Sequence, residues 1–300
     1  MQKILVLGSA NLDFVYEVPH IVVPGETLAS NTLETFPGGK GLNQAIALAH
    51  AGAKVYFAGK VGSDGTLLVD VLQQSGVDTT YVQYDETPTG HAVIQVSEKG
   101  QNSILLYQGA NFCIQPEDID KALMGFEAGD ILLMQNEISN VAYAMHAAHH
   151  KGMHIAYNPS PIGKEIDDYP LELVSWIILN EIEAQQLSGK VSTKEMLASL
   201  RSKYPKAAIV LTLGKDGVMY DNGSNVISHG IYKVPVVDTT AAGDTFTGYF
   251  LDAVVAGESS EEALRLASVA SSLAVSQKGA STSIPYIQQV RIAQLEPNRA

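Results

Sequence analysis

The sequence predicts an α/β protein: a doubly wound, mostly parallel sheet with helices on both faces, together with a small β-sheet lid. Short apolar runs alternate along the chain with helical patterns, as they do in a doubly wound sheet. Each apolar run ends in polar residues or glycine, which suits strand ends that face one crevice. Two β-rich stretches, about 14–36 and 88–108, interrupt this alternation and are assigned to the lid.

The composition predicts a single domain over residues 1–300, with the lid inserted in it, since 46% of the residues are hydrophobic. A formal net charge of −13 disfavours nucleic acid or an anionic membrane as the main partner. It leaves a small anionic substrate open, because a site can be locally positive. The single cysteine, Cys113, fits a reducing cytoplasm, and the sequence suggests neither a signal peptide nor a membrane span.

The first apolar run, residues 4–7, predicts a central strand, and the polar residues after it include Asn11 and Asp13. With one residue between them, these side chains could clamp a polyol by hydrogen bonding to neighbouring hydroxyls. The alternative is a turn in which the two side chains only bond nearby backbone and close the strand. The pattern G-x-G-x-x-G does not occur here, so the dinucleotide fingerprint is absent.

A cluster of three glycines falls within residues 38–41, directly before a predicted helix that ends at residue 51. Such a cluster requires an unusual backbone or a closely approaching ligand. Lys40 and Asn43 lie on the first turn of this helix. The alternative is a tight strand-to-helix turn without a ligand. The Walker pattern G-x-x-x-x-G-K-[ST] occurs nowhere in the chain.

The lid prediction depends on strands that leave the main alternation. Within residues 14–36, β-forming residues are broken by Pro19 and Pro24. Residues 91–96 and 103–107 alternate in polarity, as a hairpin with one wet face does. We expect these strands to pair as a second sheet that covers the site.

The remaining strands and helices are predicted from the same alternation of apolar runs and helical patterns. Strands are predicted at 54–58, 131–134, 154–157, 176–179 and Ala208–Thr212. Helices are predicted at Thr66–Gln74, 261–276 and 286–295, and another helix follows residue 137 and runs to residue 150. Four histidines, His146, His149, His150 and His154, include one pair at the helical spacing of metal ligands. We favour the alternative that they lie near a helix C-terminus, where cationic groups suit the dipole.

The stretch from Val237 to Phe246 carries the most chemistry. A β-branched run at 231–237 predicts a strand, small residues follow, and a helical pattern covers 246–255. The unpaired N–H groups of a first helical turn attract an anion, and small side chains let it approach. Asp244 then places a carboxylate beside the anion, as a general base for phosphoryl transfer requires. The alternative is that Asp244 only caps the helix.

Two of these motifs resemble the signatures of the PfkB carbohydrate kinase family, in its ribokinase branch. Gly38-Gly39-Lys40-Gly41-Leu42-Asn43-Gln44-Ala45 is similar to the first, and Asp238-Thr239-Thr240-Ala241-Ala242-Gly243-Asp244-Thr245-Phe246 is similar to the second. Further similar elements extend over nearly the whole chain: Asn11 with Asp13, 134–137, Asn180 with Glu183, 212–214 with Gly217, and 278–285. The resemblance implies a ribokinase-like fold, with one kinase domain over 1–300 and a lid that also forms a homodimer contact.

The resemblance also implies roles for individual residues. The implied sugar contacts are Asn11, Asp13, Gly39, Lys40, Asn43 and Glu137, and Asp244 is the implied catalytic base, which also contacts the sugar. Ala241, Ala242 and Gly243 are the implied anion hole, whose N–H groups stabilise charge on the transferring phosphoryl group. The implied nucleotide contacts are Asn180, Thr212, Gly214, Gly217, Gly243 and Ser268.

Two implied ion sites complete this set. Asn180 and Glu183 match an element that organises Mg²⁺ through water. Asp238, Thr240, Ala274, Gln277, Gly279 and Ser283 match a K⁺ loop, several of them through backbone oxygens. The sequence departs from the family at Ser268, where a larger polar residue is common near the adenine, and at Gln277, where arginine is common.

The implied activity is that of an ATP-dependent sugar kinase in the cytoplasm, with Mg²⁺ as cofactor and K⁺ as activator. D-Ribose, converted to D-ribose 5-phosphate, is the first expectation, favoured by residues 241–244 and 134–137. The alternatives are another kinase of the family (deoxyribokinase, fructokinase or nucleoside kinase) or a sugar sensor without catalysis. The intact Asp244 and glycine turn argue against the sensor.

Overall fold

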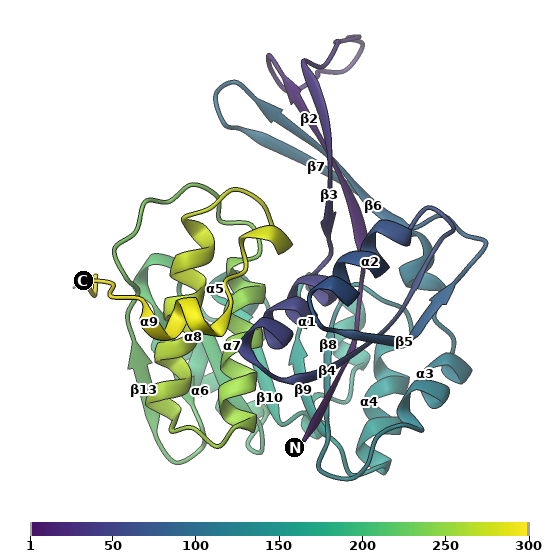
Figure 1. The fold of residues 1–300 in the computed structure, drawn as a ribbon. Coiled ribbons are helices and arrows are strands. Elements are labelled where there is room, and N and C mark those ends of the chain that lie inside the picture. Colours follow the sequence, from purple (N-terminus) through teal and green to yellow (C-terminus); the bar gives the residue numbers. More distant parts are fainter. Residues whose placement is uncertain (1, 299–300) are drawn as a thin grey trace.

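The computed structural model describes residues 2–298, and within them nine strands form one sheet in the order β13-β12-β11-β10-β9-β8-β1-β4-β5 (Figure 1). These strands are β1 (Lys3–Leu7), β4 (Lys54–Val61), β5 (Asp78–Tyr84), β8 (Ile131–Gln135), β9 (His154–Asn158), β10 (Trp176–Asn180), β11 (Ala208–Thr212), β12 (Val218–Asp221) and β13 (Val226–His229). The pairs from β11 to β5 are parallel, and β12 and β13 add an antiparallel edge. The doubly wound fold class is confirmed.

Helices cover both faces of this sheet. They are α1 (Lys40–Ala51), α2 (Thr66–Gln74), α3 (Pro116–Leu123), α4 (Val141–His150), α5 (Glu181–Ser188), α6 (Thr193–Lys203), α7 (Ala242–Val255), α8 (Ser260–Val275) and α9 (Ile287–Ile292). Successive residues of a strand point to opposite faces. Ile4 and Val6 of β1 therefore join the core under α1, α2, α7, α8 and α9, whereas Leu5 and Leu7 join the core under α3, α4, α5 and α6.

The lid is a four-stranded sheet that projects from the main body (Figure 1). Its order is β3-β2-β6-β7, with β2 at Asn11–Val18, β3 at Thr32–Gly38, β6 at Gly90–Ser97 and β7 at Asn102–Tyr107. The β2–β6 pair is parallel and the two outer pairs are antiparallel. Only three residues separate β1 from β2, so the chain passes directly from the central strand into the lid.

The strand order reverses at β1. The chain moves from β1 to β4 and β5 on one side, and later from β8 through β11 on the other. In open α/β sheets, ligands bind outside the carboxyl ends of the strands at such a switch point. The structure therefore directs attention to the residues that follow β1 and β8.

Two predicted elements were wrong. Residues 231–237 form no strand, because Pro235 lacks an N–H and the one β-bridge of this segment within residues 2–298 joins Tyr232 to Pro297. The last helix ends at Ile292 rather than residue 295, since the chain then turns to bond that segment: Lys233 N donates to Glu296 O and Asn298 N donates to Ile231 O. The helix predicted at 246–255 begins earlier, at Ala242.

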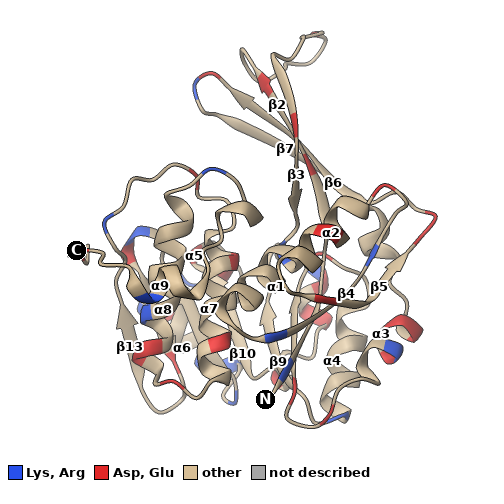
Figure 2. Ribbon diagram, viewed as in Figure 1, with Lys and Arg blue, Asp and Glu red and all other residues tan. Residues whose placement is uncertain are grey.

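Basic and acidic side chains are interspersed across the ribbon (Figure 2). No helix within residues 2–298 has the length and apolarity needed to cross a membrane. Among the same residues, no group of three or more His, Cys, Asp or Glu side chains could hold a metal ion. Of the four histidines, His149 and His150 lie in the last turn of α4, as the dipole interpretation expects, whereas His154 is the first residue of β9.

Candidate active site

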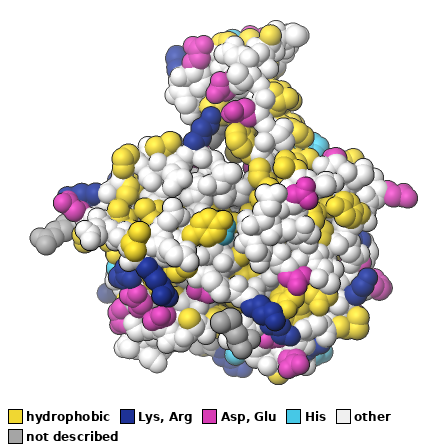
Figure 3. Space-filling view, in the orientation of Figure 1, with side chains coloured by type: hydrophobic (Ala, Val, Ile, Leu, Met, Phe, Trp, Pro, Cys, Tyr) yellow, Lys and Arg dark blue, Asp and Glu magenta, His cyan; other side chains and the backbone are white. Residues whose placement is uncertain are grey.

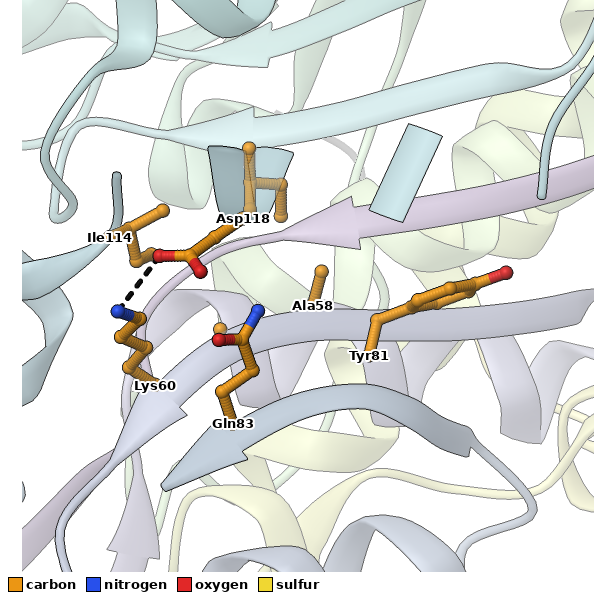
Figure 4. A pocket seen from close by; sticks show the side chains of 8 residues that line it. Ala58, Lys60, Tyr81, Gln83, Ile114 and Asp118 are labelled. Atoms are coloured by element: carbon orange, nitrogen blue, oxygen red, sulfur yellow. Dashed lines mark ion pairs between the residues drawn. The ribbon is translucent and has the colours of Figure 1, made fainter. Parts of the chain in front are cut away.

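A small cavity beside β4 can be set aside first. It measures about 10 Å³, room for at most one water molecule, and lies next to an ion pair between Lys60 and Asp118 at 2.8 Å (Figure 4). Its other lining residues are Leu7, Ala58, Gly59, Tyr81, Gln83 and Ile114. Such a cavity cannot accept a substrate.

Asn11 and Asp13 share one face of β2, because they are two residues apart in a strand. The turn interpretation of this pair is therefore wrong. Asn11 Oδ1 accepts a hydrogen bond from Asn111 Nδ2 at 2.8 Å, which fixes its orientation. The Asp13 carboxylate lies against Gly38, where an added Cβ would come within 2.1 Å of Asp13 Oδ2. Gly38 thus leaves room for the carboxylate.

The glycines before α1 serve close backbone packing. Gly39 has a φ of 94°, in the region that favours glycine, and an added Cβ at Gly41 would lie 2.5 Å from Ser9 N. The strand-to-helix interpretation of this cluster is therefore correct for the glycines themselves. Their consequence is that the first turn of α1, with Lys40 and Asn43, is held directly against the loop after β1.

Lys40 lies among three carboxylates. Burial alone would lower the pKa of Lys40, but the charges of Asp244, Glu137 and Glu183 together raise it above its ordinary value. Glu137 Oε2 accepts hydrogen bonds from Ser9 Oγ and from Lys40 N. Burial raises the pKa of Glu137, opposed by Lys40 and Ser9. The site therefore combines one partly buried cation with several carboxylate acceptors.

Asp244 lies at the third position of α7 and is 8% exposed. The N-cap is Ala241, at a φ of 57°, and no side chain caps this helix. The Asp244 carboxylate instead accepts two amide hydrogen bonds from α1, from Asn43 Nδ2 at 3.0 Å and from Gln44 Nε2 at 2.9 Å. The helix-cap interpretation of Asp244 is therefore wrong, and its carboxylate faces the first turns of α1.

A glycine contact brings α1 and α7 this close together. An added Cβ at Gly248 would lie 2.4 Å from the Cβ of Ala47. Gly248 is one turn beyond Asp244, and Ala47 is one turn beyond Asn43 on the facing helix. The close approach of the two backbones here lets short amide side chains reach the carboxylate.

The first turn of α7 offers unpaired donors. Of the predicted anion-hole residues, Ala242 donates its N–H to Thr239 O at 3.3 Å. Within the described residues, the backbone N–H groups of Gly243 and Asp244 donate to no carbonyl or side chain. A Cβ added at Gly243 would meet no atom within 4 Å, so it would project into open space. Free N–H groups, a positive dipole end and an open approach make this turn able to bind an anion.

A large cavity of about 780 Å³ opens beside that turn. Ala242 and Gly243 form one part of its wall, and apolar side chains such as Tyr232, Val236 and Phe246 form another. The six residues predicted to contact a nucleotide all line it: Asn180, Thr212, Gly214, Gly217, Gly243 and Ser268. Its volume lies within the range of pockets that hold cofactor-sized ligands.

Asn180 and Glu183 form a reciprocal capping box at the start of α5. Asn180 Nδ2 donates to Glu183 Oε1 at 2.9 Å, Asn180 N donates to Glu183 Oε2 at 2.9 Å, and Glu183 N donates to Asn180 Oδ1 at 3.0 Å. Glu183 is 6% exposed, so its carboxylate is held in place close to the cavity wall that Asn180 lines.

Asp238 links two of the segments that were predicted to hold a cation. Asp238 Oδ1 accepts a hydrogen bond from Thr240 N, and Asp238 Oδ2 accepts one from Gly279 N at 3.0 Å. Asp238 thus bonds nearby backbone, as aspartate often does in turns, and it also joins the segment before α7 to the segment after α8. The carbonyl oxygens of Asp238, Thr240 and Gly279 accept no hydrogen bond from any residue of 2–298.

Several polar residues of the site were not singled out from the sequence. Ser9 binds Glu137, Asn111 orients Asn11, and Asn298 lines the cavity. Gln44 and Gln135 both lay inside motifs that the sequence analysis noticed, but nothing in those motifs indicated which neighbours their amides would meet. Only the fold brings α1, β8 and α7 together.

Comparisons with known proteins agree with this geometry. Residues 1–287 match the model of the pfkB family carbohydrate kinases. Ribokinase of Haemophilus influenzae is 38% identical, over 96% of this chain and 97% of the relative. Two solved structures cover 97% of the chain: ribokinase of Cryptococcus neoformans with ADP (TM-score 0.85, 33% identity, 99% of that chain) and Arabidopsis thaliana ribokinase with ribose and ATP (TM-score 0.84, 32% identity, 97% of that chain). With its fold, its glycine-rich helix start and its aspartate beside an anion-binding turn, this chain belongs to the PfkB family of carbohydrate kinases.

Proposed function

We propose that this protein phosphorylates D-ribose with ATP, giving D-ribose 5-phosphate and ADP. The observation that carries the proposal is the location of Asp244. Its carboxylate is hydrogen bonded to Asn43 on the sugar side, and the preceding residue in the same turn, Gly243, lines the large cavity. A hydroxyl bound on one side and a phosphate on the other would meet at this aspartate.

The sugar would bind between β2 and the start of α1. Asp13 and Glu137 would accept hydrogen bonds from hydroxyls, and Asn11, Lys40 and the N–H of Gly39 would donate them. Asn43 Oδ1 is buried and has no partner within the described residues. A sugar hydroxyl would supply the missing donor, since unpaired buried oxygens are costly.

In the reaction, Asp244 would take the proton of the primary hydroxyl while that oxygen attacks the γ-phosphorus in line with the leaving ADP. The oxygen–phosphorus bond to the sugar forms as the bond to the β-phosphate oxygen breaks. The unpaired N–H groups of Gly243 and Asp244 would stabilise charge on the transferring phosphoryl group, with Ala241 and Ala242 setting the turn. The cavity lined by Thr212, Gly214, Gly217 and Ser268 would hold the nucleotide.

The test is a coupled assay of ADP release with pentoses, hexoses, deoxyribose and nucleosides. We expect kcat/KM to be highest for D-ribose, because relatives named ribokinase are similar over nearly the whole chain. If kcat/KM is higher for deoxyribose, fructose or a nucleoside, that compound and not ribose is the substrate. ADP release with none of them would favour a sugar sensor.

We propose Mg²⁺ as the cofactor, near Glu183, whose carboxylate is held by Asn180 of the cavity wall. When bound to the nucleotide, it supplies charge neutralisation for the phosphate oxygens. Asn180 and Glu183 already bond each other, so we propose that they act on Mg²⁺ through water rather than as direct ligands. Their part is to fix a carboxylate and an amide at the cavity wall.

K⁺ is proposed as an activator held by backbone carbonyls of the loop around Asp238, Thr240, Ala274, Gln277, Gly279 and Ser283. The unpaired carbonyls of Asp238, Thr240 and Gly279 fit such an ion. The loop leads directly into the turn at Gly243. A bound cation would therefore fix the backbone of that turn and the direction of its N–H groups.

We expect kcat to fall when K⁺ is replaced by Na⁺, and to fall further with a bulky organic cation, at fixed ionic strength and saturating Mg²⁺. K⁺-dependent stabilisation in thermal unfolding should accompany the change. Equal kcat and KM in all three salts would leave Asp238 as a structural turn residue.

We further propose that residues 1–300 act as one kinase domain, that the enzyme is a homodimer joined through the lid, and that it works in the cytoplasm, consistent with its single cysteine, Cys113. The lid exposes apolar side chains that a partner subunit would cover. Among them are Leu33 of β3 and Ile104, Leu105 and Leu106 of β7, each at least 44% exposed.

A further inference from the structure

Three buried amide side chains form a hydrogen-bonded chain behind Asp244. Gln44 comes from α1, Gln135 from the end of β8 and Asn158 from the end of β9. Gln44 and Gln135 are fully buried and Asn158 is 9% exposed. The reaction proposed above uses none of them: none lines the large cavity, and none is among the residues proposed to hold the sugar.

The direction of every bond in this chain is determined by its two ends. Asn158 Nδ2 donates to the backbone carbonyl of Ile178 at 2.8 Å, and a carbonyl can only accept. Asn158 Oδ1 therefore faces Gln44 Nε2, 3.2 Å away. Gln44 Nε2 also donates to Asp244 Oδ1 at 2.9 Å, and a carboxylate likewise can only accept.

Gln135 fixes the other half of the Gln44 amide. Its Nε2 donates to Gln44 Oε1 at 2.7 Å, so the Gln44 amide cannot turn over and present its oxygen to Asp244. Gln135 Oε1, by contrast, is buried and has no partner within the described residues. A buried unpaired carbonyl opposes folding, so what this glutamine contributes is the bond that its Nε2 makes to Gln44.

The carboxylate itself needs two points of support. The terminal torsion of an aspartate is broad, and a single donor holds only one of its oxygens. Asn43 Nδ2 holds Oδ2, and Gln44 Nε2 holds Oδ1 from a neighbouring position on the same helix. Two donors fix the plane of the carboxylate and hence the direction of the lone pairs left for a hydroxyl proton.

We propose that Gln44 is a positioning residue for the base Asp244, and that Gln135 and Asn158 hold the Gln44 amide in the one orientation that donates to it. This inference rests on the proposed kinase function. Misplacing a reacting group by a fraction of its contact distance slows the chemical step more than it weakens binding. Substitutions in these three amide side chains should therefore lower kcat and leave KM for the sugar and KM for ATP nearly unchanged.

The test compares Gln44→Met with the wild-type enzyme. Methionine has a similar length but cannot donate, so we expect kcat to fall about 10- to 100-fold, with KM for ribose and for ATP within about threefold. In the Asp244→Asn background, where no base remains to be oriented, the same substitution should leave the residual turnover unchanged.

Two results would overturn the proposal: an unchanged kcat in Gln44→Met, or an equal loss in the Asp244→Asn background. Gln73→Met is the matched control, because Gln73 Nε2 bonds Thr79 Oγ1 on an exposed face and its loss should leave kcat unchanged. If Gln44→Met does not fold, Gln135→Met decides by the same criteria, with a smaller expected loss. An inactive wild-type enzyme would instead contradict the kinase function itself.

Discussion

The Asp13 side chain shows a conflict between stability and function at the scale of one residue. Burial, with a smaller contribution from the charge of Glu137, raises the pKa of Asp13 to about 7 from an ordinary value of 3.8. The folded protein therefore binds this proton more tightly than the unfolded chain does. Between these two pKa values stability falls as pH rises, and the whole penalty is present above pH 7.

We therefore expect Asp13→Asn to raise the unfolding free energy of the sugar-free protein at pH 8 by at least about 1 kcal/mol, and to raise its melting temperature accordingly. At pH 4 the substitution should have little effect. The same variant should raise KM for the sugar much more than KM for ATP. Thermal unfolding at both pH values, without ligand, measures the first effect. An equal change in melting temperature at pH 4 and pH 8 would show that the Asp13 charge is not the cause.

Sequence patterns could identify residues whose chemistry is local to a motif. Asp244, Asn43, Lys40 and Glu137 lie close together, as Asp244–Asn43 and Lys40–Glu137 hydrogen bonds show. The role of Gln44 could not be predicted, because it depends on the ends of β8 and β9, more than 90 residues away along the chain. A polar residue within a motif has no assigned partner until the fold provides one.

At the scale of elements, patterns with a clear period were predicted well. The helix Thr66–Gln74 and the strand Ala208–Thr212 have the expected bounds. The β-branched run at 231–237 failed because strand propensity alone does not provide a neighbouring strand. The strands β5, β12 and β13 were not predicted. β5 and β13 are the edge strands, where mixed exposure weakens the apolar pattern, and β12 has only four residues.

The start of α7 allows a test of the anion-binding turn. A methyl group at Gly243 would meet no protein atom, and alanine favours a helix more than glycine does. We expect Gly243→Ala to fold with an unchanged or slightly higher melting temperature. Its methyl group would occupy the approach of the phosphate, so kcat/KM for ATP should fall about tenfold or more.

The matched measurement for this variant is sugar binding by calorimetry without nucleotide, which should stay at the wild-type value. A wild-type kcat/KM for ATP in Gly243→Ala would exclude close approach of a phosphate to this turn.

At the scale of the molecule, the lid is the part that the main body does not cover. It projects away from the body, and apolar atoms lie exposed along it (Figure 3). β7 is an edge strand exposed along its whole length, with Leu105 at 72%. Exposed apolar edge strands are points of association.

We expect sedimentation velocity at micromolar concentration to show a dimer, and Leu105→Lys to shift it toward the monomer. The lid also carries Asn11 and Asp13, so dissociation should raise KM for the sugar. A wild-type protein that sediments as a monomer at about 10 µM would associate more weakly than a stable interface allows. That result would contradict the proposed lid contact.

The central claim is that Asp244 links a sugar site on β2 and α1 to a nucleotide site at the start of α7. The most direct measurement compares Asp244→Asn with wild type in binding and in turnover. Asparagine keeps the size of the side chain, so calorimetry should give affinities for ribose and ATP within about threefold of wild type, while kcat should fall about 10²- to 10⁴-fold. A variant that retains more than about a tenth of the wild-type kcat would show that Asp244 is not the base.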